Sequence, residues 1–164
     1  MAARARICDD RGAAGLSWVV DEPMERTSPA LAADGRVWLV DPVDDPQVME
    51  RVAELGAVVG VLQLLDRHGR DCAAIAARLG VPHHLCPERI EGAPFEPVRL
   101  TWRRGWREVA LWWSDLRLLV VPEAVGANRF FTVGRGRLGV HPLLRLVPPR
   151  RLLAYRPAVV LTGA

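Results

Sequence analysis

The chain has 164 residues, half of them hydrophobic and a quarter charged, which is the composition of a globular domain rather than of a disordered segment. All 22 basic residues are arginine, and against 19 acidic residues they give a net charge of +3. No run approaches the ~18 apolar residues that a membrane span requires, and the acidic start of the chain lacks the apolar core of a signal peptide.

The first half of the chain is expected to alternate strands and helices. Short runs rich in β-branched and aromatic residues predict strands at 15–21, 28–32, 36–41, 58–65 and 81–86. A helix is expected after Asp44 or Asp45, which can cap its start, with Pro46 in the first turn and Gly56 as the stop. A second, alanine-rich helix is expected at 72–79. This order predicts a mostly parallel sheet with crossover helices.

The second half is expected to be mainly strands, at 99–102, 108–113, 117–121 and 158–161. Helical segments are expected at 141–146 and 150–155. No internal repeat and no linker interrupts the sequence, so the prediction is a single domain over residues 1–164. The three cysteines show no CxxC spacing, which favours a reduced, cytoplasmic chain.

Charge is distributed unevenly along the chain. Residues 1–98 hold ten arginines and sixteen acidic residues, a net charge of −6, whereas residues 99–164 hold twelve arginines and three acidic residues, a net charge of +9. A basic half of this kind can attract nucleic acid, an anionic substrate or an acidic partner. It can equally face the acidic half of its own chain or of a second copy. The use of arginine alone is simply explained by a GC-rich genome.

The most informative polar segment is the loop 66–71, which follows the nearly continuous apolar run 58–65. Such a run is typical of a strand that is buried on both faces of a sheet. Open α/β sheets place their binding sites beyond the carboxyl ends of strands of this type. The loop is therefore the first candidate site.

Around this loop the sequence resembles the metallo-β-lactamase superfamily. In that family a hairpin ends in an aspartate-bearing strand, and a helix, a strand with a histidine-rich loop, a second helix and a further strand follow. The segments that match this order are 30–42, 45–56, 58–71, 73–84 and 159–163. The resemblance implies an α/β fold of the four-layer αββα type, in a small version, with two mixed sheets between outer helices.

The family's metal-binding residues do not match. Its His-x-His-x-Asp-His loop falls on Asp66, His68, Arg70 and Asp71, so one histidine is retained. The other ligand positions that the resemblance implies fall near Arg103 or Arg104, near Glu123 and on Ala164.

An arginine at a ligand position argues against a metal ion, because a guanidinium does not deprotonate and repels a dication. We expect Arg70 to pair with Asp66 or Asp71 where the family binds metal, and we expect no cofactor. The candidate vestigial site is Asp66, His68, Arg70, Asp71 and Glu123. The protein is then a degenerate member that acts in binding or assembly, with a second copy or another protein as partner.

Two alternatives stay open. The first is a hydrolase with a reduced zinc or manganese site, whose ligands would be Asp66, His68, Asp71 and Glu123. The second is a nucleic-acid-binding module, because the segment 99–113 interleaves tryptophan with arginine; its candidate residues are Arg103, Arg104, Trp106 and Arg107. The same mixture also forms cation–π contacts within folded sheets. No membrane partner is expected.

Other chemistry-bearing residues are expected to have structural roles. His84 and Cys86 share one side of a predicted strand, but the sequence offers no second ligand cluster at a suitable spacing. Cys72 lies at a predicted helix start, where the adjacent Asp71 opposes thiolate formation. His141 precedes a proline and is expected in a turn.

Overall fold

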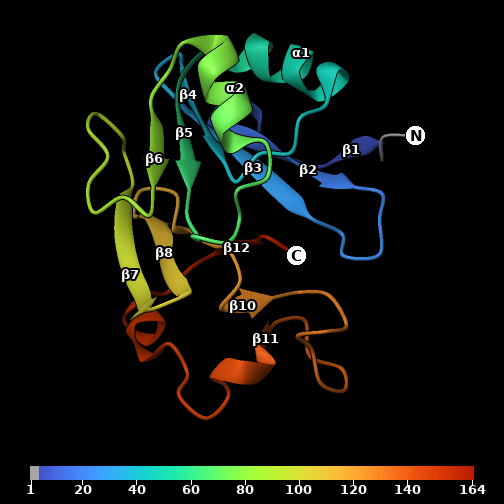
Figure 1. Cartoon of the computed structure of the whole chain (residues 1–164), viewed down its shortest axis with the longest axis vertical. Coiled ribbons are helices and arrows are strands. Elements are labelled where there is room, and N and C mark those ends of the chain that lie inside the picture. The colour runs from blue at the N-terminus through green and yellow to red at the C-terminus, as the bar shows by residue number, and fades with distance from the viewer. Residues whose placement is uncertain (1–3) are drawn as a thin grey trace. The chain divides into compact units, whose positions relative to one another are not determined.

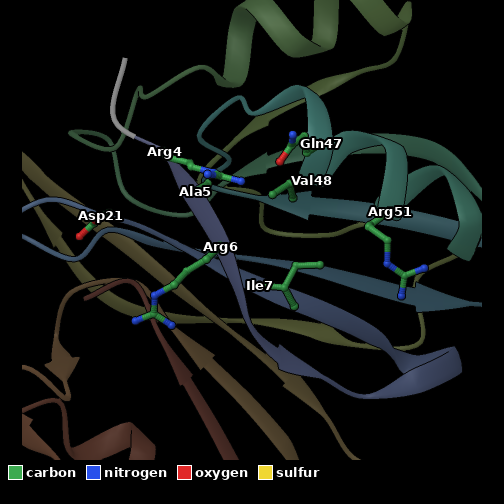
Figure 2. A pocket seen from close by; sticks show the side chains of 8 residues that line it. All are labelled: Arg4, Ala5, Arg6, Ile7, Asp21, Gln47, Val48 and Arg51. Carbon is green, nitrogen blue, oxygen red and sulfur yellow. The ribbon is translucent and has the colours of Figure 1, made fainter. Parts of the chain in front are cut away.

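A computed structural model describes residues 4–164 as a mixed α/β fold. The chain forms two compact units (Figure 1): an N-terminal unit of residues up to 63 together with 68–85, and a C-terminal unit of residues 64–67 and 86–164. Each unit contains its own sheet. None of the helices within residues 4–164 has the length and apolar character needed to cross a membrane.

The sheet of the N-terminal unit has six strands in the order β1-β2-β3-β4-β5-β6. They are β1 (Ala5–Asp10), β2 (Gly15–Val20), β3 (Thr27–Ala33), β4 (Arg36–Val40), β5 (Ala57–Gln63) and β6 (His83–Leu85). Strands β1 to β4 pair antiparallel, and only β4, β5 and β6 pair parallel. The expectation of a mostly parallel sheet is therefore wrong, because consecutive hairpins supply the first four strands.

Strand β1 was not predicted, since three of its six residues are charged. It lies at the edge of the sheet, where charged side chains are tolerated because only one side of the strand is paired.

Both predicted helices of the N-terminal unit are confirmed. Helix α1 (Pro46–Leu55) begins where the Asp45 carboxylate accepts hydrogen bonds from the backbone N–H groups of Gln47 and Val48, at 3.0 and 3.1 Å. Helix α2 (Cys72–Leu79) ends at Gly80, whose φ of 65° is in the left-handed region.

The two helices pack on the same face of the sheet (Figure 1). Val48 and Val52 of α1 and Ile75 of α2 form one hydrophobic core with the strands. Trp18 on β2 is fully buried in this core, and its indole N–H donates to the Val43 carbonyl at 3.0 Å. The core fixes the strand ends from which the loop 66–71 departs.

The C-terminal unit has a four-stranded sheet in the order β12-β9-β8-β7 and a two-stranded sheet. The strands are β7 (Glu96–Arg103), β8 (Trp106–Trp113), β9 (Leu118–Val121), β10 (Val125–Gly126), β11 (Gly139–Val140) and β12 (Val159–Thr162). Strands β12 and β9 pair parallel and the other pairs are antiparallel.

The helical segments expected in this unit are shorter than predicted. They are the 3-10 turns η2 (Pro142–Leu144) and η3 (Arg150–Ala154), a turn type that also occurs at η1 (Gly12–Ala14). Pro148 and Pro149 lie between η2 and η3 and prevent a longer helix. In place of an outer helix, Leu144 and Leu152 pack on the sheet residues Val98, Ala110 and Leu119.

Candidate functional site

The loop after β5 belongs to both units. Asp66 and Glu123 lie in the C-terminal unit, whereas His68, Arg70 and Asp71 lie in the N-terminal unit. The gathering of all five side chains in one site therefore stays a prediction, and so does the pairing of Arg70 with Asp66 or Asp71. Within each unit the surroundings of these residues are defined.

In the N-terminal unit, His68 and Arg70 both contact Asp41, a buried residue directly after β4. The His68 Nδ1 atom lies 3.3 Å from the Asp41 Oδ2 atom. The Arg70 guanidinium donates to the backbone carbonyls of Asp41 and Thr27, both at 2.8 Å, and to the Ser28 hydroxyl at 3.3 Å. We call these five residues the Asp41 cluster.

The backbone of the Asp41 cluster adopts an uncommon conformation at two positions. Asp41 and Arg70 have φ angles of 40° and 39°, in the left-handed region that non-glycine residues rarely adopt. The Ser28 hydroxyl donates to the Asp41 carbonyl at 2.9 Å and accepts from the Val43 N–H at 3.2 Å. Several hydrogen bonds therefore hold these strained residues in place.

Electrostatics at the cluster is set by burial and by the Asp41–Arg70 pair. Burial lowers the pKa of the Arg70 guanidinium, and the Asp41 carboxylate opposes that shift. A guanidinium nevertheless remains protonated in proteins. Arg70 is thus a permanent positive charge at the position where the resembled family has a carboxylate ligand.

Asp71 and Cys72 connect the loop to α2. The Asp71 carboxylate accepts a hydrogen bond from the Asp44 N–H at 2.8 Å and does not cap its own helix. The Cys72 thiol is fully buried, and burial, followed by the nearby Asp41, raises its pKa to about 12. Since the thiolate is the nucleophilic form, this shift disfavours a nucleophilic Cys72.

In the C-terminal unit, Asp66 and Glu123 each lie near an arginine. The Asp66 Oδ2 atom is 3.7 Å from the Arg107 Nε atom. Glu123 accepts a hydrogen bond from Arg67 at 2.6 Å, and the Arg67 guanidinium lies 4.4 Å from the centre of the Trp106 ring.

Next to Glu123 lies a carboxyl group that sequence reasoning missed. Glu108 on β8 is fully buried. Its carboxylate accepts hydrogen bonds from the backbone N–H groups of Glu123 at 2.7 Å and Ala124 at 2.6 Å. The Trp106 indole N–H donates to it at 2.8 Å. Burial raises the pKa of Glu108, against the lowering effect of these donors. A lone acidic residue inside the apolar run of β8 was the signal that could have identified it.

His141 begins the turn η2, as expected, and it is also buried in this region. Its Nδ1 atom accepts from the Leu143 N–H at 3.2 Å, and its ring meets Trp106 edge to face at 4.8 Å between ring centres. Its Nε2 atom lies 3.7 Å from the Glu123 Oε1 atom. Burial lowers the pKa of His141, and Glu123 opposes that shift. Both ring nitrogens of His141 therefore face fixed partners. His141 and Glu108 together organise the packing of the C-terminal unit.

The remaining predicted residues occupy different surroundings. Arg103 and Arg104 are exposed at the turn between β7 and β8. Trp106 faces His141 and Arg67, and the exposed tryptophan is Trp102, whose ring lies 4.5 Å from the Arg99 guanidinium. At β6, the His83 Nε2 atom lies 3.0 Å from the Gln63 Oε1 atom. After this strand, the Cys86 thiol donates to the Arg107 carbonyl at 3.2 Å.

The donor atoms for a metal are few. In the N-terminal unit the loop supplies one imidazole and the Asp71 carboxylate, beside the Arg70 guanidinium. Over residues 4–164, no three side chains of His, Cys, Asp or Glu gather closely enough to hold a metal ion.

No protein-family model matches the sequence, and no curated protein matches it. Solved structures do match. The chain is similar to VMB-1, with a TM-score of 0.70 and 8% identity, and to the DIM-1 metallo-β-lactamase, with a TM-score of 0.66 and 11% identity; each match covers 99% of this chain and 90% of the other. TTHA1623, solved in a di-iron-bound form, matches at a TM-score of 0.59 and 16% identity over 87% of this chain and 89% of that chain. At such identities the likeness concerns the fold.

Proposed function

We propose that this chain, which has the metallo-β-lactamase fold, is a degenerate form without a dinuclear metal hydrolase site and acts by binding or assembly. The observation that carries the proposal is Arg70. Its guanidinium is tied to three oxygen acceptors of the Asp41 cluster at the loop where the resembled family binds metal.

The charge of Arg70 is the first physical argument. Two unit charges about 4 Å apart interact by roughly 4 kcal/mol at an effective dielectric constant near 20, and a dication doubles that repulsion. Three hydrogen bonds keep the guanidinium from swinging away, and deprotonation is not available to it. A metal ion near this loop would be opposed by a fixed positive charge.

The orientation of His68 is the second argument. Its Nδ1 atom faces Asp41, an arrangement that in metalloproteins orients a ligating histidine. Here His68 is the only histidine of the loop 66–71, so one imidazole would have to serve a site that usually needs about three protein ligands. The His68–Asp41 contact is then a part of the Asp41 cluster's hydrogen bonding.

Zinc and manganese binding test the proposal. The thermal unfolding of the purified protein is followed with EDTA and then with zinc or manganese, for the unchanged chain and for His68→Ala. His83→Ala is the matched control, because His83 also hydrogen-bonds within the N-terminal unit but lies outside the loop. We expect no metal-dependent change in any of the three. A stabilisation by metal that His68→Ala abolishes and His83→Ala keeps would instead support the hydrolase with ligands Asp66, His68, Asp71 and Glu123.

A further inference from the structure

The segment 129–156 of the C-terminal unit has an unusual composition. It contains seven arginines, all of them exposed, at positions 129, 135, 137, 145, 150, 151 and 156. It contains no aspartate or glutamate, and none occurs anywhere from residue 124 to residue 164. In Figure 1 the segment is the orange-to-red part of the chain after β10, formed by loops, β11 and the turns η2 and η3.

The same segment holds the most exposed large apolar side chains among the described residues. Four side chains are more than 70% exposed among the described large hydrophobic residues: Val133 at 73%, Leu143 at 74%, Leu146 at 94% and Leu153 at 83%. All four lie in the segment 129–156. Outside the segment, the highest value in the described part of the chain is 58%, at Met24. Folding alone gives no reason to collect such residues in one region.

The exposed side chains project from an anchored backbone. Phe131 and Leu144 are buried, and the Arg145 guanidinium donates to the Phe131 carbonyl at 3.2 Å. Leu143, beside the buried Leu144 in the turn η2, points into solvent, and the exposed Leu146 follows three residues after Leu143. The turn therefore presents apolar side chains at its surface while its other residues hold it on the unit.

We propose that the segment 129–156 docks on the surface of a membrane that contains anionic phospholipid. Arginines next to an anionic bilayer gain electrostatic attraction, and apolar side chains gain by burial at the boundary of headgroups and acyl chains. Nucleic acid would use the arginines but would leave exposed leucine and valine in water. This proposal replaces the expectation of no membrane partner, which rested on the lack of a segment long enough to span a membrane. Docking at the surface needs no such segment, so it is compatible with the absence of a spanning helix in residues 4–164.

The docking is independent of the proposed loss of the metal site, because the exposed apolar residues and the Asp41 cluster lie in different units. Co-sedimentation measures it, with vesicles of phosphatidylcholine alone and of phosphatidylcholine mixed with phosphatidylserine. We expect binding to the mixed vesicles only, weakening as salt is raised.

Variants assign the binding to the segment. Leu143→Ser combined with Leu146→Ser removes two insertable side chains and is expected to weaken binding about tenfold or more. Arg135→Glu combined with Arg137→Glu is expected to weaken it at least about fivefold for each lost charge. Circular dichroism checks that each variant is folded.

Controls come from elsewhere in the chain. Met24→Ser removes an exposed apolar side chain of the N-terminal unit, and Arg103→Glu with Arg104→Glu reverses two exposed charges outside the segment. Both are expected to bind vesicles nearly as the unchanged protein does.

Three results would overturn the proposal. They are no binding to the phosphatidylserine vesicles, equal loss in Met24→Ser and in the Leu143 and Leu146 variant, or binding to single-stranded RNA that exceeds vesicle binding and needs the same arginines.

Discussion

Replacing Arg70 by alanine tests how the loop is held. The change removes three hydrogen bonds from a charged donor to the Thr27 and Asp41 carbonyls and to the Ser28 hydroxyl. Such bonds contribute about 1 kcal/mol or somewhat more each, and the buried Asp41 also loses its neighbouring positive charge. We expect the free energy of unfolding to fall by about 2–4 kcal/mol.

The backbone at Arg70 offers a second variant that separates conformation from hydrogen bonding. The φ of 39° favours glycine, so Arg70→Gly loses the same bonds but relieves strain. It should be less destabilising than Arg70→Ala by about 1 kcal/mol. Arg6→Ala, at an exposed position of β1, is the control and should change stability little.

Urea unfolding followed by tryptophan fluorescence measures these differences, since Trp18 and Trp38 lie in the sheet of the N-terminal unit. An Arg70→Ala protein as stable as the unchanged one would refute the reasoning. It would mean that Arg70 is not part of the Asp41 cluster in solution.

Three further predictions concern the C-terminal unit and the cysteines. Burial lowers the pKa of His141 below its ordinary 6.5, so the folded state binds fewer protons than the unfolded state. The free energy of unfolding should therefore fall as the pH drops below about 6.5. His141→Gln should flatten this pH dependence in thermal melts, and an unchanged slope would contradict the assignment to His141. Because burial raises the pKa of Cys72 to about 12, Cys72 should resist alkylation in the folded protein while the exposed Cys8 reacts. Mass spectrometry measures the labelling of each cysteine, and equal labelling would contradict the burial of Cys72. Single-stranded RNA should bind weakly, and a sub-micromolar, salt-sensitive affinity lost in Arg103→Glu with Arg104→Glu would favour the nucleic-acid alternative.

The elements that could be predicted are those with local signals. Asp45, Pro46 and Gly56 mark both ends of α1 by capping and turn chemistry that involves only neighbours in sequence. Gly80 ends α2 for the same reason. The fold implied by the resemblance to the metallo-β-lactamase superfamily, built on the order of such elements, is confirmed by the matches to solved structures.

The elements that were missed depend on contacts distant in sequence. The charged strand β1 forms because β2 offers a pairing edge, and the prolines near η2 and η3 shorten helices that apolar spacing alone would extend. The two mixed sheets that the resemblance implies are present, but the share of antiparallel pairs in the N-terminal sheet escaped prediction, since hairpin and crossover connections differ in geometry more than in composition.

The candidate site shows the same limit. The position of Arg70 in the loop was apparent, but its acceptors include two backbone carbonyls, and every residue has one. Glu108 and His141 lie 33 positions apart in the sequence, and both contact Trp106. No motif spacing in the sequence predicts this cluster. Whether Asp66 and Glu123 join His68 stays a prediction.

The metal content of the protein tests the central proposal most directly. The protein would be purified without chelator, incubated with excess zinc or manganese, dialysed, and measured by inductively coupled plasma mass spectrometry. Because the loop carries the fixed charge of Arg70, the proposal predicts far less than one bound metal ion per chain. This result is expected for the unchanged protein and for His68→Ala alike. One metal ion per chain that is lost in His68→Ala and kept in His83→Ala would contradict the proposal and establish a metal-binding site at the loop.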